Sequence, residues 1–157
     1  MLTIIGCGNL NRSDDGVGSI IASRLVALPN LPSGARIFDA GTGGMEVMFQ
    51  ARGASRLIII DASQSGSKPG SIFEVPGSEL EGEPPAGFNL HEFRWDHALY
   101  AGRRMFRDEF PEDVTVFLIE AANLNLGTAL SPAVAAAADK LFTTLRSRLG
   151  LSRGGVD

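Results

Sequence analysis

The sequence predicts a three-layer α/β/α sandwich around a mainly parallel, twisted sheet with one antiparallel edge strand. Short apolar runs alternate along the chain with segments whose apolar residues recur at helical spacing. The run at 57–60 is unbroken and largely β-branched, which indicates a central strand buried on both faces. The run at 71–75 follows too soon for a helical crossover, so we expect it to be antiparallel and at an edge.

The other elements follow from the same periodicities and from capping residues. Strands are predicted at residues 2–5, 36–38, 57–60, 71–75 and 114–119. Helices are predicted at residues 17–28, around 45–49, from about Asn89 to Arg107, and from Pro132 to Leu149. We expect residues 1–150 to form a single domain and residues 151–157 to be a frayed tail.

The composition of the chain excludes several classes of protein. With 157 residues, 44% hydrophobic and 20% charged, it fits one ordinary globular domain. The net charge of −4 and the lack of a basic stripe argue against nucleic acid as a partner. The lone Cys7 predicts neither a disulfide nor a structural zinc site. No apolar run is long enough to span a membrane and no signal-peptide pattern precedes the first strand, so we expect a cytoplasmic location.

Acidic residues stand at or just after the ends of the first three predicted strands. These are Asp14 and Asp15, then Asp39, then Asp61. If those strands are neighbours, the carboxylates converge in one crevice at the carboxyl edge of the sheet. Any one of them alone is more often a helix cap or turn residue. Three together repel one another, and proteins tolerate such a cluster chiefly where a cation or a shared proton compensates.

Two histidines are available to complete such a site, His91 and His97. Two carboxylates and one imidazole form a plausible site for a divalent transition metal, with coordination positions left open. Because the two histidines are six residues apart on one predicted helix, they should lie on different faces of it. We expect His91, near the helix start, to face the carboxylates, and His97 to pack internally or lie on the surface.

The sequence gives less support to the hypotheses of a nucleotide-binding site or of a serine or cysteine nucleophile. Gly6-x-Gly8 lacks the third glycine of a dinucleotide fingerprint, no Gly-Lys-Ser/Thr follows, and Asp14 and Asp15 would repel a phosphate. No Gly-x-Ser-x-Gly nucleophile elbow occurs. Backbone amides could lower the pKa of Cys7, but a small buried residue in a tight turn is the favoured interpretation.

Five motifs, in order along nearly the whole chain, resemble those of the nickel–iron hydrogenase maturation endopeptidases. They are Gly6-Cys7-Gly8-Asn9 with Asp14-Asp15-Gly16-Val17-Gly18; Asp39-Ala40-Gly41-Thr42-Gly43-Gly44-Met45-Glu46; Ile59-Ile60-Asp61-Ala62; Asn89-Leu90-His91; and Gly127-x-x-Leu130-Ser131-Pro132. The chain departs from the family pattern in three places: the polar stretch 11–13, Asn89 in place of serine, and Ala121 in place of proline.

The resemblance implies a nickel- or cadmium-binding trio of Asp15, Asp61 and His91, with Asp15 shorter than the glutamate often found there. It also implies an endopeptidase that removes a C-terminal peptide from the hydrogenase large-subunit precursor, whose nickel is the recognition signal. Nickel thus comes with the substrate, and we expect a monomeric enzyme. Asp39 is expected to orient a ligand or serve as a base, or else to cap the turn at 41–44.

Two further hypotheses remain open at this point. The same residues could serve a non-catalytic adaptor that binds metal or precursor without cutting. Alternatively, the chain could be a small-ligand-binding α/β domain. A cleavage assay separates the first from a peptidase, and a thermal-shift screen tests the second.

Overall fold

The structure, a computed structural model, describes residues 1–87 and 92–151. The strands are β1 (Leu2–Cys7), β2 (Ala35–Gly41), β3 (Arg56–Ser63), β4 (Ile72–Pro76) and β5 (Asp113–Glu120). The α-helices are α1 (Val17–Val26), α2 (Gly44–Ala51), α3 (Trp95–Phe106) and α4 (Pro132–Arg148). Short 3₁₀ turns are η1 (Ser13–Gly16), η2 (Gly77–Glu79) and η4 (Arg107–Glu109).

The strands form one five-stranded sheet in the order β2-β1-β3-β5-β4. The pairs β1–β2, β1–β3 and β3–β5 are parallel, whereas β4 pairs with β5 in antiparallel fashion. The mainly parallel sheet and its antiparallel edge strand are therefore confirmed. The first three strands are also neighbours, with β1 between β2 and β3, which was the condition for the acidic residues to converge.

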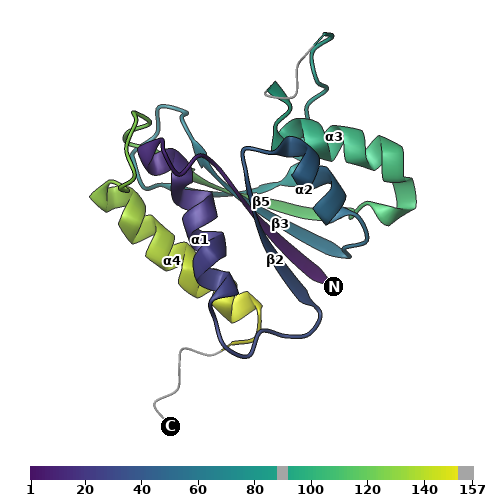
Figure 1. Ribbon diagram of the computed structural model, residues 1–157, viewed down its shortest axis with the longest axis horizontal. Coiled ribbons are helices and arrows are strands. Elements are labelled where there is room, and N and C mark those ends of the chain that lie inside the picture. The colour runs from purple at the N-terminus through teal and green to yellow at the C-terminus, as the bar shows by residue number, and fades with distance from the viewer. Residues whose placement is uncertain (88–91, 152–157) are drawn as a thin grey trace.

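The sheet separates two helical layers, with α1 and α4 on one face and α2 and α3 on the other (Figure 1). Side chains of β3 alternate between the two cores, as the pleat of a strand requires. Ile58 and Ile60 pack in the cluster with α1 and α4, while Leu57 and Ile59 pack in the cluster with α2 and α3. All four are fully buried, which explains the unbroken apolar run in the sequence.

The start of α3 corrects one sequence prediction. The helix begins at Trp95, and the described residues before it, 92–94, are not α-helical. Arg94 has an extended backbone, with φ −100° and ψ 177°, and its N–H donates to Nδ1 of His97 at 3.2 Å. The helix expected from about Asn89 is thus too long at its start. The prediction of one continuous helix that carries both His91 and His97 is wrong for the same reason.

The topology places a crevice at one edge of the sheet. From β1 the chain crosses through α1 to β2 on one side, and it later returns to β3 on the other side of β1. In open α/β sheets, ligands bind beyond the carboxyl ends of strands where the order reverses in this way. None of the helices in the described residues combines the length and apolarity needed to cross a membrane.

Candidate active site

A hollow of about 190 Å³ lies at this carboxyl edge. Its floor is the end of β1 at Cys7 and Gly8, and one wall is the glycine-rich backbone of residues 41–44, between β2 and α2. The lining also includes the charged side chains of Asp15, Asp61 and Arg94 and the polar side chains of Thr42 and Trp95. The site therefore combines the sheet with segments from both helical layers.

Asp61 is the buried carboxylate of the hollow, with 5% of its surface exposed. Its Oδ1 accepts a hydrogen bond from the Ala62 backbone N–H at 2.8 Å, and its Oδ2 accepts one from Trp95 Nε1 at 2.8 Å. Nη2 of Arg94 lies 3.5 Å from the same Oδ2. Burial raises the pKa of Asp61 to about 7, although these three donors act to lower it.

Asp15 is the second carboxylate of the hollow, and it reaches there from the turn η1. Its Oδ2 accepts a hydrogen bond from the Asn9 backbone N–H at 3.0 Å. Its charge is near enough to Asp61 to contribute to the raised pKa of that residue. The convergence of Asp15 and Asp61 in one hollow agrees with the expectation from the strand order.

Asp14 has a different role from its neighbour. It is fully buried and points away from the hollow, toward the loop between β5 and α4. Its carboxylate accepts hydrogen bonds from the backbone N–H groups of Ala122, Asn123 and Ser131 and from Oγ of Ser131, at 2.7 to 3.0 Å. Burial alone raises its pKa, but the hydrogen bonds from Ser131, Ala122 and Asn123 outweigh it and leave the pKa below its ordinary value.

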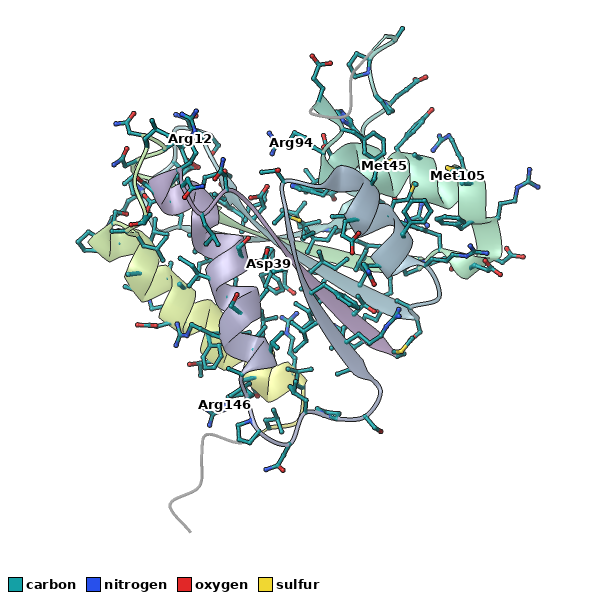
Figure 2. All side chains as sticks on the ribbon, viewed as in Figure 1. Arg12, Asp39, Met45, Arg94, Met105 and Arg146 are labelled. Carbon is teal, nitrogen blue, oxygen red and sulfur yellow. The ribbon has the colours of Figure 1, made fainter. Side chains whose placement is uncertain are left out.

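Asp39 lies near the hollow but is not part of its lining. Its Oδ1 accepts hydrogen bonds from Oγ of Ser19 at 2.7 Å and from the Gly41 backbone N–H at 2.9 Å. Asp39 therefore connects the turn after β2 to α1. This is the turn-capping role that the sequence offered as one alternative for Asp39. In Figure 2 it lies between the two helical layers. A role as base or ligand-orienting group stays a prediction.

The two histidines are separated by the limits of the described residues. His91 lies outside them, so its expected place opposite the carboxylates stays a prediction. His97 does not line the hollow. Its Nδ1 accepts the Arg94 N–H, and its Nε2 lies 3.8 Å from Asp96. It thus serves the start of α3, in line with the packing role expected for it.

Sequence reasoning missed Arg94 and Trp95. Both follow His91 by a few residues, but the stretch was expected to lie inside a helix rather than at its first turn. Because α3 starts at Trp95, this pair points toward the carboxyl edge of the sheet, and Figure 2 shows Arg94 reaching from the start of α3 toward the α1 side. The available signal was an adjacent pair of side chains that only donate hydrogen bonds, close to a predicted carboxylate cluster.

Cys7 is buried beneath the hollow and is not activated as a nucleophile. Burial raises its pKa well above the ordinary thiol value, and the negative charges of Asp61 and Asp39 raise it further. A thiol nucleophile needs the opposite environment, one that stabilises the thiolate. The structure thus agrees with the interpretation, made from the sequence, that Cys7 is a small buried residue in a tight turn.

The donor chemistry of the hollow suits a cation that arrives with ligands of its own. Asp15 and Asp61 are oxygen ligands, and two of them leave most coordination positions open. Among the described residues, no group of three His, Cys, Asp or Glu side chains is arranged to hold a metal ion. The expected third ligand, His91, is outside those residues.

Comparisons with known proteins agree with this architecture. A family model described as hydrogenase maturation protease matches residues 21–147. The hydrogenase 2 maturation protease of Escherichia coli K12 is 29% identical over 136 residues, which cover 86% of this chain and 82% of that protein. A putative hydrogenase maturation protease of Methanocaldococcus jannaschii is 32% identical over 92 residues, 57% of this chain and 59% of that protein.

Solved structures give the same result for the fold. The hydrogenase maturating endopeptidase HybD from Escherichia coli superposes with a TM-score of 0.80 at 26% sequence identity, covering 95% of this chain and 91% of that one. The likeness includes the mixed sheet with its helices on both faces. Together with the family match over most of the sequence, it shows that the chain belongs to the hydrogenase maturation protease family.

Proposed function

We propose that this chain is an endopeptidase that removes the C-terminal extension of a nickel-loaded hydrogenase large-subunit precursor and recognises the nickel of that precursor. The observation that carries the proposal is the hollow itself. Two carboxylates from different segments, Asp15 and Asp61, face one space at the switch point of the sheet. We expect the enzyme to act as a cytoplasmic monomer.

In this proposal, Asp15, Asp61 and His91 bind the nickel that the precursor presents. A carboxylate binds a metal in its ionised form, so nickel binding displaces the proton that burial favours on Asp61. A divalent cation so placed polarises the scissile carbonyl group or activates a water molecule. The hydrogen bonds from Trp95 and Ala62 fix the orientation of the Asp61 carboxylate during this step.

The glycine-rich wall supports a second part of the mechanism. α2 begins at Gly44, which lines the hollow, so the N-terminal end of the helix, whose first backbone N–H groups have no partner within the helix, lies beside it. Unpaired amides of this kind stabilise negative charge on a carbonyl oxygen during acyl transfer. We assign them to the scissile carbonyl. Asp39 then contributes indirectly, because it holds the turn that leads into α2.

The direct test is incubation of the protein with nickel-loaded precursor from the same organism, followed by intact-mass analysis. We expect the precursor to lose its C-terminal extension, and nickel-free precursor to stay whole. Asp61→Asn should slow cleavage by about a hundredfold or more, because it removes a metal-binding charge. Equal cleavage of loaded and nickel-free precursor would contradict nickel recognition. Tight binding without cleavage would indicate the non-catalytic adaptor instead.

A further inference from the structure

Arg94 holds Asp61 by a loose contact. Its Nη2 is 3.5 Å from Oδ2 of Asp61, whereas charge-assisted hydrogen bonds to a carboxylate are about 2.7–2.9 Å long. The Arg94 side chain is 63% exposed and that of Asp61 only 6%. The guanidinium therefore neutralises the buried carboxylate from the solvent side without being locked in place.

Arg94 also lines the same hollow as both carboxylates. Among the described residues that line the hollow, it carries the positive charge, while Asp15 and Asp61 carry the negative charges. Two nearby carboxylates without a cation repel each other and favour protonation. Arg94 supplies the compensating charge that these carboxylates need when no metal is bound.

A divalent cation would compete directly with this guanidinium. Oδ1 of Asp61 is already bonded to Ala62 and Oδ2 to Trp95, and Arg94 covers Oδ2 from the solvent side. A metal ion bound to the carboxylate would lie within a few ångströms of a like charge. Repulsion at that distance near a protein surface changes an affinity by about tenfold or more.

A second hollow gives the guanidinium a place to move to. Arg94, Trp95 and Asp15 line this neighbouring space as well, together with Asp96. Oδ1 of Asp96 has no hydrogen-bond partner among the described residues. In this second hollow, a displaced Arg94 thus stays close to the carboxylate of Asp96.

We propose that Arg94 is the displaceable counter-ion of the metal-free enzyme. In the free enzyme, its guanidinium provides the positive charge beside the carboxylates that nickel provides when the precursor is bound. The free enzyme therefore binds dissolved divalent cations weakly. Contacts made by the precursor chain move the guanidinium aside and admit the metal that the precursor carries. This inference rests on the proposed function, and it makes Arg94 a specificity-determining residue for precursor-held metal.

The test is calorimetric titration of the free protein with Ni²⁺ in a buffer that does not chelate metals. We expect Arg94→Ala and Arg94→Gln to bind Ni²⁺ about tenfold more tightly than the unchanged protein. Arg94→Lys, which keeps the charge, should bind as weakly as the unchanged protein. The control is Arg104→Ala, because Arg104 is an exposed cation of the same helix that bonds to the Tyr100 carbonyl oxygen. It should leave Ni²⁺ affinity unchanged.

Two outcomes would overturn the inference. One is unchanged or weaker Ni²⁺ binding by both Arg94→Ala and Arg94→Gln, with melting curves showing that they are folded. The other is an equal gain in Arg104→Ala, which would reflect net charge alone. Adding Asp61→Asn to Arg94→Ala should abolish the gain, since the two residues act on the same metal.

The precursor assay separates failure of this inference from failure of the proposed function. If the unchanged protein cleaves nickel-loaded precursor but Arg94→Ala shows no gain in Ni²⁺ affinity, only the role of Arg94 is wrong. If the gain is present but no precursor is cut, the peptidase proposal fails and the counter-ion role stands. Where both hold, free Ni²⁺ should inhibit Arg94→Ala at about tenfold lower concentration than the unchanged enzyme.

Discussion

At the scale of single residues, two aspartates of the same chain show how environment decides the state of a carboxylate. Asp14 and Asp61 are both buried. Four donors surround the carboxylate of Asp14, and its pKa is lowered. Asp61 accepts two hydrogen bonds and has the Arg94 guanidinium 3.5 Å away, and burial raises its pKa to about 7. The first carboxylate stabilises the fold, and the second is the one that we propose binds the precursor's nickel.

The pH dependence of stability tests this difference for Asp61. A carboxyl group whose pKa rises from 3.8 in the unfolded chain to about 7 in the fold favours folding at low pH, and this contribution is lost as pH rises through 7. Between pH 5 and pH 8 the loss amounts to roughly 2–3 kcal/mol. Asp61→Asn lacks this titration. From pH 5 to pH 8, its free energy of unfolding should therefore rise by that amount relative to the free energy of unfolding of the unchanged protein. Urea denaturation at both pH values measures it.

Asp14→Asn is the matched control. Its stability relative to the unchanged protein should change with pH in the opposite direction from that of Asp61→Asn. A lowered pKa means that the Asp14 carboxylate stabilises the fold above its unfolded pKa and loses this effect as pH falls through the folded pKa. The amide also places N–H groups against donors, at a cost of about 2–4 kcal/mol near pH 7. Equal pH slopes in the two variants would show that the two carboxylates do not differ as described.

At the scale of elements, the contact between α1 and the sheet sets the position of Asp15. A Cβ atom on Gly18 would lie 2.3 Å from the Ile60 carbonyl oxygen and 2.4 Å from the Cys7 carbonyl oxygen. These are backbone atoms of β3 and β1, which have little freedom to move. The bare backbone at Gly18 thus lets α1 start directly against the two strands that end at the hollow, three residues after Asp15.

Gly18→Ala should therefore destabilise the protein, although alanine favours a helix by about 1 kcal/mol over glycine. Overpacking at such a contact costs typically about 1–3 kcal/mol, and moving α1 away would also shift Asp15 from Asp61. We expect a lower melting temperature and slower precursor cleavage. Gly34→Ala is the control, because a Cβ atom there meets nothing within 4 Å. A Gly18→Ala variant as stable and active as the Gly34→Ala variant would refute this account of α1.

The beginning of α3 shows where local sequence signals stop being sufficient. Helix starts are recognised from Ser, Thr, Asp or Asn at the cap, and Asn89 offered that signal. The actual cap is Arg94, whose backbone is extended. Its backbone N–H donates to Nδ1 of His97, a residue of the helix itself. Gly44 also packs against the Phe93 carbonyl oxygen so closely that a Cβ atom would lie 2.2 Å from it. This tertiary contact with α2 has no counterpart in the local sequence.

At the scale of the whole molecule, the sequence predicted what depends on burial and strand adjacency. Apolar runs marked the strands because both faces of the sheet are covered, and parallel neighbours brought Asp15 and Asp61 together. The role of Asp14 could not be read in the same way, because its partner Ser131 lies 117 residues away along the chain. Arg94 and Trp95 were missed because their place depends on how α3 docks on the sheet.

The two hydrophobic clusters allow stability and activity to be separated. Leu141 of α4 is 2% exposed in the cluster with α1, on the face opposite α3, and it lines neither of the two hollows. Leu141→Ala should lower the free energy of unfolding by about 2–5 kcal/mol. Because the substitution leaves the residues around Asp61 unchanged, the rate of precursor cleavage per folded molecule should stay the same at temperatures well below the melting transition.

Leu99→Ala is the comparison on the other face. Leu99 is fully buried in α3, one turn after the residues that meet Asp61, so its cavity should cost similar stability but also loosen Trp95 and Arg94. We expect this variant to cleave precursor more slowly even when it is fully folded. Denaturation curves give the folded fraction, and intact-mass analysis gives the rate. A loss of rate in Leu141→Ala equal to that in Leu99→Ala would mean that the site depends on overall stability, and not on the docking of α3 against the sheet.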